Sequence, residues 1–229
     1  MIAFEYHDIM PLDVGRVITP ELLDEVPPAE AIPSLRDLVR INRYLGGYST
    51  LRSMLRQIVA PTEPFSLLDV GAASGDMGRV VLHGYPNASV TSFDYKLDHL
   101  TPAANPRLVG DAFALPFKNA SFDFVFSSLF LHHFDDAQVV DLLRGFRRIA
   151  RRAVLAIDLE RGPLAAAFLP ATAWLFGWHP ITLHDGPVSV HAAFKRDELL
   201  ALSQAAGLTN AAVRVHRPWS RLSLIARTS

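Results

Sequence analysis

The chain contains no cysteine among its 229 residues. Without thiols it can form no disulfide framework, no thiolate metal site and no cysteine nucleophile. Its charges nearly cancel, with 22 Lys and Arg against 23 Asp and Glu and no block of one sign. Domains that bind nucleic acids normally carry a basic stripe, so this balance argues against a nucleic-acid partner.

The sequence also shows no internal repeat, no low-complexity tract and no targeting pattern. Residues 1–8 contain no basic region followed by an apolar run, so we expect no signal peptide and a cytoplasmic protein. Half of the residues are hydrophobic, which is enough for a full core. The length suits one large domain, or one domain with additions.

A glycine loop stands out near residue 70. The mostly apolar run 67–70 leads into Gly71 and Gly75, which have only small residues between them. This pattern predicts a buried strand, a tight turn and a helix that begins near Asp76. Small residues let the backbone lie against a ligand, and the free N–H groups of a helix N-terminus attract an anion.

Acidic residues stand at the predicted ends of three strands. Asp69 lies at the end of the first run, Asp94 follows the run 90–93, and Asp111 follows 108–110. Open α/β sheets bind ligands at the carboxyl ends of their strands. We therefore expect the three carboxylates to line one crevice.

This series of residues resembles the class I S-adenosylmethionine-dependent methyltransferases. The resemblance is to the branch of quinone and small-molecule methyltransferases, and it covers roughly residues 65–160. One departure is Ala73, where the family's loop often has a glycine. The matching segments are 69–75, Asp94, 110–112, 115–117, 121–125 and 131–134.

The resemblance implies an α/β, Rossmann-like, mainly parallel seven-stranded sheet with helices on both faces and an antiparallel C-terminal hairpin. It also implies S-adenosylmethionine as cofactor, which becomes S-adenosylhomocysteine. By resemblance, Asp69 and the loop hold the methionine part, Asp94 accepts from the ribose hydroxyls and Asp111 accepts from the adenine amino group. The implied cofactor-binding residues are Asp69, Gly71, Ala72, Ala73, Gly75, Asp94, Tyr95, Asp111, Ala112, Ser127 and His132.

Histidines are the candidate catalytic residues. His133 follows the fourth predicted strand, at the crevice rim, where it could take a proton from a phenol or enol. A phenol has a pKa of about 10 and is a poor nucleophile while neutral, so a base would help. His184 is a second candidate base, and either histidine could instead only shape the pocket. We expect no metal, because the spacing of His184, Asp185 and His191 fits no common ligand pattern.

The alternation of strand and helix predicts the remaining elements. Ser34 is expected to cap a helix that stops at 46–47, and a second helix should follow at 51–59. A short helix is expected after Pro20. The other predicted helices are 76–83, 136–150 and 196–206, and the predicted strands are 66–70, 89–93, 107–109, 122–127, 153–158, 211–215 and 222–226.

Two segments lie outside this core. Residues 1–62 are predicted to form an N-terminal arm and helical cap before a cofactor-binding domain at 63–229, which carries a lid insertion at about 161–194. The lid is apolar nearly all round but too broken by prolines to span a bilayer. It could close over an acceptor, pack on the sheet or meet a partner subunit. The predicted acceptor-binding residues are Arg43, Tyr44, Phe168, Trp174 and His191.

The favoured function is methyl transfer to a small, apolar or aromatic acceptor that is phenolic, quinone-like or polyketide, with oxygen favoured over carbon. The protein would be a monomer or a homodimer. One alternative is a nicotinamide-dependent oxidoreductase, although Gly71-x-Ala73-x-Gly75 is not the G-x-G-x-x-G pattern of that class. The other alternative is a non-catalytic scaffold that keeps the methyltransferase fold.

Overall fold

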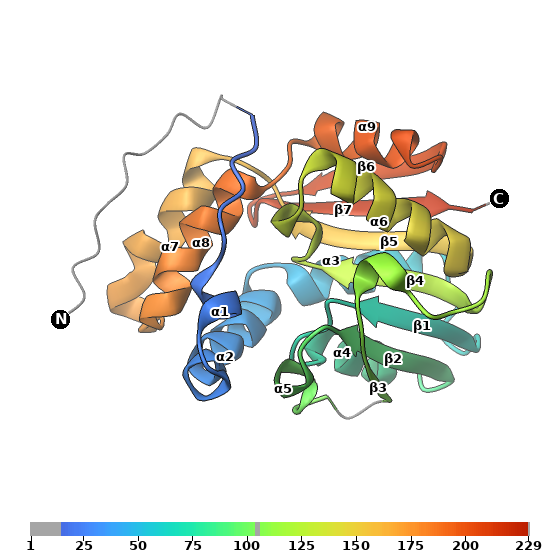
Figure 1. Cartoon of the computed structure of the whole chain (residues 1–229), viewed down its shortest axis with the longest axis horizontal. Helices are drawn as coiled ribbons and strands as arrows, with labels where there is room; N and C mark the ends of the chain where they lie inside the picture. Colours follow the sequence, from blue (N-terminus) through green and yellow to red (C-terminus); the bar gives the residue numbers. More distant parts are fainter. Residues whose placement is uncertain (1–14, 104–105, 229) are drawn as a thin grey trace.

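The computed structural model describes residues 15–103 and 106–228 and contains one seven-stranded sheet (Figure 1). The strand order is β3-β2-β1-β4-β5-β7-β6, in which β1 to β5 are parallel and β7 runs antiparallel to both of its neighbours. The predicted fold class is confirmed. The strands are β1 (Phe65–Val70), β2 (Ala88–Asp94), β3 (Arg107–Val109), β4 (Phe122–Ser128), β5 (Ala150–Leu159), β6 (Asn210–His216) and β7 (Arg221–Arg227).

Helices cover both faces of the sheet (Figure 1). The α-helices are α1 (Leu22–Glu25), α2 (Pro28–Tyr44), α3 (Gly47–Arg56), α4 (Asp76–Gly84), α5 (Leu97–Leu100), α6 (Asp136–Ile149), α7 (Pro163–Phe176), α8 (Pro180–Ala192) and α9 (Arg196–Ala205). Two short 3₁₀ turns are η1 (Ala112–Ala114) and η2 (Leu131–His133).

The core is divided by the sheet into two layers. In β1, Leu68 packs on the side of α6 and α9 with Leu142 and Leu199, whereas Leu67 packs on the side of α3 and α4 with Met77. Successive side chains of a strand point to opposite faces, and both faces are covered here. This is why the central strands read as nearly continuous apolar runs.

The start of α2 differs from the prediction. The helix begins at Pro28 rather than after Ser34, because proline fits the first helical position, whose N–H has no partner within the helix. Ser34 lies inside the helix, and its hydroxyl bonds Thr182 of α8 at 3.0 Å. The short helix expected after Pro20 is α1, and the part of the arm at residues 1–14 lies outside the described residues.

The helices α7 and α8 lie side by side at the end of the sheet, and the N-terminal segment 15–21 runs along α8 (Figure 1). The backbone N–H of Val17 donates to the carbonyl of His191 at 3.1 Å. No residue of α7 is fully buried, although the helix is apolar nearly all round. Within residues 15–103 and 106–228, no helix is long and apolar enough to cross a membrane.

Candidate active site

A cavity of about 1330 Å³ lies at the carboxyl ends of the parallel strands. Residues that follow β1, β2, β3 and β4 form one side of it. The other side comes from the N-terminal residues 18–24, the helices α2, α7 and α8, and residues 218–221, where the chain turns from β6 into β7. The cavity therefore lies between the sheet edge and the segments that precede and interrupt the sheet.

The glycine loop and two of the predicted acids meet at the sheet side of this cavity. The Asp94 carboxylate accepts from the backbone N–H of Ala73 at 2.9 Å and from that of Lys96 at 3.1 Å. Asp111 accepts from the N–H of Phe113 at 2.9 Å. Ala73 has φ of 43°, a left-handed conformation that disfavours alanine by about 1–2 kcal/mol. The hydrogen bond from the Ala73 N–H to Asp94 holds the loop in that conformation, although this position carries an alanine and not a glycine.

Asp69, the third predicted acid, lies outside the cavity wall. Its side chain is buried behind the loop, and its Oδ2 atom has no hydrogen-bond partner among the described residues. Burial raises the pKa of Asp69 well above its usual value, and the charges of Asp76 and Asp94 raise it further. Asp76 itself accepts from the side-chain amide of Asn42 at 3.2 Å.

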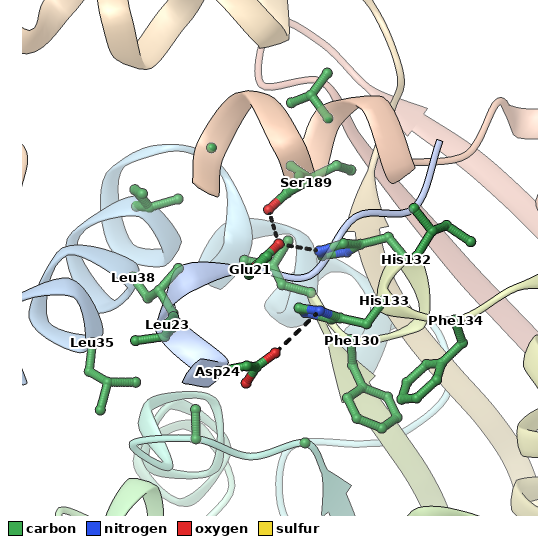
Figure 2. Close-up of a pocket in the computed structure, with 18 of the residues that line it drawn as sticks. Glu21, Leu23, Asp24, Leu35, Leu38, Phe130, His132, His133, Phe134 and Ser189 are labelled. Atoms are coloured by element: carbon green, nitrogen blue, oxygen red, sulfur yellow. Dashed lines mark hydrogen bonds and ion pairs between the residues drawn. The ribbon is translucent and has the colours of Figure 1, made fainter. Parts of the chain in front are cut away.

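A buried ionic clasp joins the N-terminal segment to the sheet, and Figure 2 shows its Glu21–His132 contact. We use this name for Glu21, His132 and Asp158. The Nδ1 atom of His132 lies 2.6 Å from Asp158, and its Nε2 atom lies 3.5 Å from Glu21. Glu21 also accepts from the Ser189 hydroxyl.

The clasp carries a charged histidine. Burial alone would lower the pKa of His132, but the carboxylates of Asp158 and Glu21 outweigh it and raise that pKa to about 10. His132 is therefore an imidazolium at neutral pH, with no lone pair for a substrate proton. Its predicted contact with a cofactor stays a prediction, although His132 does line the cavity.

His133 is in the opposite electrostatic state. Burial lowers its pKa, and the charge of His132 lowers it further, so the ring is neutral at pH 7. The two histidine rings stack with their centroids 4.4 Å apart. The Nδ1 atom of His133 lies 3.9 Å from the Asp24 carboxylate (Figure 2). A neutral, cavity-facing histidine beside an acid has the properties of a general base.

Glu21, His132 and His133 also place one potential metal-ligand atom each within 4.8 Å of one another. A protonated His132 has no free nitrogen for a metal, because its Nδ1 and Nε2 both carry protons. The arrangement suits an ion-paired cluster better than a metal centre. The expectation of no metal stays a prediction.

The structure brings only part of the predicted site together. Tyr44 and Trp174 are 62% and 85% exposed, so neither contributes to the cavity wall. The predicted residues that line the cavity are Gly71, Ala73, Asp94, Tyr95, Asp111, Ala112, His132, His133 and Phe168. Those outside its wall are Asp69, Ala72, Gly75, Ser127, Arg43, Tyr44, Trp174, His184 and His191.

His184, the second predicted base, is bonded to its neighbour. Its Nδ1 atom lies 2.8 Å from Asp185. Asp185 in turn accepts from the backbone N–H groups of Leu22 and Leu23, at 2.9 and 3.0 Å. The pair therefore holds the start of α1, which is a structural role.

Several side chains of the site were missed by sequence reasoning: Glu21, Asp24, Phe130, Asp158 and Arg221. Asp158 ends a buried strand, so the rule that selected Asp94 and Asp111 could have selected it too. Glu21 and Asp24 lie in an arm without periodicity, and no sequence signal separates them from surface acids.

The clasp predicts a pH-dependent contribution to stability. Its His132 part is complete below the usual pKa of 6.5 and is lost as pH rises through about 10. Its Glu21 part is complete above the usual pKa of 4.5 and is lost as pH falls toward about 2. Both contributions are complete between pH 4.5 and pH 6.5. Replacing Glu21 with glutamine should therefore lower Tm most in this range.

Thermal melts across the pH range test this. The Tm difference between the wild type and Glu21→Gln should be largest at mildly acidic pH and should narrow only as pH approaches about 10, because Asp158 keeps the pKa of His132 raised in the variant as well. Glu30→Gln is the matched control, since Glu30 is exposed on α2 and belongs to no such cluster. A difference for Glu21→Gln that stayed constant with pH would contradict the clasp.

Comparison with known proteins agrees with this geometry. A family model described as "Methyltransferase domain" matches residues 68–165. Demethylmenaquinone methyltransferase of Thermotoga maritima is 29% identical over 131 residues, which are 54% of this chain and 56% of that protein. Malonyl-[acyl-carrier protein] O-methyltransferase 1 of Coxiella burnetii is 33% identical over 100 residues, which are 44% of this chain and 35% of that protein.

A solved structure has a similar fold. A SAM dependent methyltransferase from Aquifex aeolicus superposes with a TM-score of 0.60 over 89% of this chain and 100% of that chain, at 15% identity. The chain spans about half the length of the first curated relative and about a third of the second. Residues 68–165 therefore match the methyltransferase domain of the class I S-adenosylmethionine-dependent methyltransferases.

Proposed function

We propose that the protein transfers the methyl group of S-adenosylmethionine to an oxygen atom of a small, apolar or aromatic acceptor. One observation carries this proposal. A single cavity has acids, a glycine loop and a neutral histidine at the strand ends, and apolar side chains opposite them. Its volume of about 1330 Å³ exceeds that of most single-ligand pockets, so it has room for a cofactor and an acceptor together.

The sheet side of the cavity fits the cofactor. A carboxylate has about four acceptor positions, and Asp94 uses two of them for backbone N–H groups, which leaves two for the ribose hydroxyls. Asp111 keeps one oxygen free of the Phe113 bond, and the neighbouring Ala112 and Phe113 offer a surface for a flat ring. Bound S-adenosylmethionine supplies an electrophilic methyl group on a sulfonium. The chain positions the acceptor and excludes water.

His133 is proposed as the base for the acceptor's proton. The Asp24 carboxylate near Nδ1 favours a proton on that nitrogen and leaves Nε2 as the acceptor. A phenol that loses its proton to Nε2 becomes a far better nucleophile. This need for a base favours methylation of oxygen.

The apolar wall indicates the chemistry of the acceptor. Leu35 and Leu38 of α2 and Phe168 and Leu169 of α7 all line the cavity. The names of the two curated relatives mention a quinone precursor and a malonyl group on a carrier protein, so they do not agree on one acceptor. A phenolic, quinone-like or polyketide acceptor suits the wall. The nicotinamide alternative finds no support in the family.

Binding of S-adenosylhomocysteine tests the cofactor side without a known acceptor. Replacing Asp94 with alanine should weaken binding by about 1.5–3 kcal/mol, or about 10- to 150-fold, because hydrogen bonds to a charged acceptor are lost. Titration calorimetry measures this. Asp98→Ala, a neighbouring acid on α5 outside the cavity wall, should bind like the wild type. Equal affinities for the wild type and Asp94→Ala would contradict the assignment, provided that melts show both to be folded.

A further inference from the structure

One arginine in the cavity wall has no partner for part of its charge. Arg221 is the first residue of β7, lines the cavity and is only 1% exposed. Its Nε atom donates to the carbonyl of Leu45 at 3.2 Å. Its Nη1 atom has no hydrogen-bond partner among the described residues. Buried arginines are normally paired, so this orphaned group needs an explanation.

The acid that offsets the charge of Arg221, Asp158, already accepts hydrogen bonds from other groups. Asp158 accepts from the Nδ1 atom of His132 at 2.6 Å and from the backbone N–H of Leu159 at 2.8 Å. Burial lowers the pKa of Arg221 to about 10, and Asp158 offsets that effect only in part. The charge on Arg221 is therefore incompletely balanced inside the protein.

The acidic and basic side chains of the cavity wall lie at different places. The acidic side chains of its wall are Glu21, Asp24, Asp94 and Asp111. Asp94 and Asp111 are on the proposed cofactor side, and the other two contact the histidines. Among the described lining residues, Arg221 is the one lysine or arginine. It lies on the side of the cavity that α7, α8 and the β6–β7 turn form, where the proposed function places the acceptor.

We propose that the guanidinium of Arg221 binds a carboxylate of the methyl acceptor. A guanidinium matches the planar geometry of a carboxylate, and one positive charge balances a monoanion better than a doubly charged phosphate. The acceptor would then be an apolar or aromatic acid. This inference rests on the proposed function, because it names the class of molecule that enters the acceptor side.

A carboxylate could also come from the methionine part of the cofactor, so the experiment separates the two sources. The probes are 2-naphthoate and 2-naphthamide, which share size and shape and differ in charge. Binding of each is titrated in the presence of saturating S-adenosylhomocysteine. The affinity for S-adenosylhomocysteine itself is measured separately for every variant.

The wild type should bind 2-naphthoate about tenfold or more tightly than 2-naphthamide, since a charged hydrogen bond distinguishes them. Arg221→Gln should remove this preference, and Arg221→Lys should keep part of it. Both variants should bind S-adenosylhomocysteine within about twofold of the wild type, because the charged bond at issue would not be to the cofactor. Arg217→Gln is the matched control, because Arg217 is 69% exposed and pairs with Glu160 outside the cavity.

Stability gives a second readout. Since Nη1 has no partner, replacing Arg221 with methionine should lower Tm by no more than the loss of the one Nε bond to the Leu45 carbonyl requires, whereas loss of a structural ion pair would lower it further. A preference for naphthoate that survives in Arg221→Gln would overturn the proposal, as would a wild type that binds neither probe.

Weaker S-adenosylhomocysteine binding in Arg221→Gln, with the naphthoate preference kept, would assign the arginine to the cofactor and would also overturn the proposal. The proposed function fails by a different result, namely a wild type that does not bind S-adenosylhomocysteine.

Discussion

Replacing His133 with asparagine is expected to lower the rate of methyl transfer to a phenol by about 10²–10³-fold at neutral pH, the usual contribution of a general base. 2-Naphthol is a suitable probe acceptor, and transfer is followed with methyl-labelled S-adenosylmethionine. Affinity for S-adenosylhomocysteine should stay within about twofold, because the cofactor-side acids are untouched. His133 is the one proposed base that lines the cavity and is neutral at pH 7.

The pH profile distinguishes a base from a residue that only shapes the cavity. In the wild type, the rate should rise with pH through the lowered pKa of His133 and be flat above about pH 7. Without the base, only the ionised phenol reacts, so the rate of His133→Asn should keep rising up to the phenol's pKa of about 10. The defect should therefore shrink at high pH.

His184→Asn is the control for this experiment. His184 bonds Asp185 and lies outside the cavity wall, so its loss should leave the pH profile unchanged. If His133→Asn lowered the rate equally at every pH, its role would be positional and the base would have to be sought elsewhere.

The fold was largely predictable because its signals are local. The strands were placed to within about three residues, since apolar runs and the acids that end them mark a parallel sheet directly. Asp94 and Asp111 line the cavity for the same reason, because the ends of parallel strands meet at one edge. The helix start at Pro28 was missed because Ser34 has the composition of a cap but uses its hydroxyl on α8.

The acceptor side could not be predicted in the same way. An apolar helix such as α7 shows no preferred face in its sequence, so Trp174 was assigned to a pocket while its side chain is 85% exposed. Glu21 reaches His132 only because segment 15–21 folds back along α8, a contact between residues more than 100 positions apart. Arg221 reads in the sequence as an ordinary strand end. Contacts between residues that are far apart in the chain produce no periodic pattern in the sequence.

Replacing Gly71 with valine is expected to abolish measurable binding of S-adenosylhomocysteine. Gly71 has φ of 70°, a conformation that is strained for any residue with a side chain. A Cβ atom at this position would lie 2.3 Å from Cδ2 of Phe130, whose ring lines the cavity. A valine therefore displaces Phe130 and also occupies the space beside the loop that the cofactor needs.

Phe130 changes how this experiment must be designed, because a loss of binding could follow from a distorted fold. Gly71→Ala should destabilise the protein by about 1–3 kcal/mol from the backbone strain alone, and the ring contact adds to this. The double variant Gly71→Ala with Phe130→Ala removes the ring contact but not the strain. The fall in Tm from Phe130→Ala to the double variant should therefore be smaller than the fall from the wild type to Gly71→Ala.

Melting curves and calorimetry on the wild type, Gly71→Val, Phe130→Ala and their double variant separate the two effects of Gly71→Val. Relative to Phe130→Ala alone, the double variant should lose less stability than Gly71→Val loses relative to the wild type, but it should recover none of the binding, because the valine remains at the loop. Gly84→Val is the matched control, since nothing lies within 4 Å of a Cβ built at Gly84, which does not have the left-handed φ of Gly71. It should bind like the wild type. A folded Gly71→Val that still bound S-adenosylhomocysteine would show that the cofactor does not approach this loop.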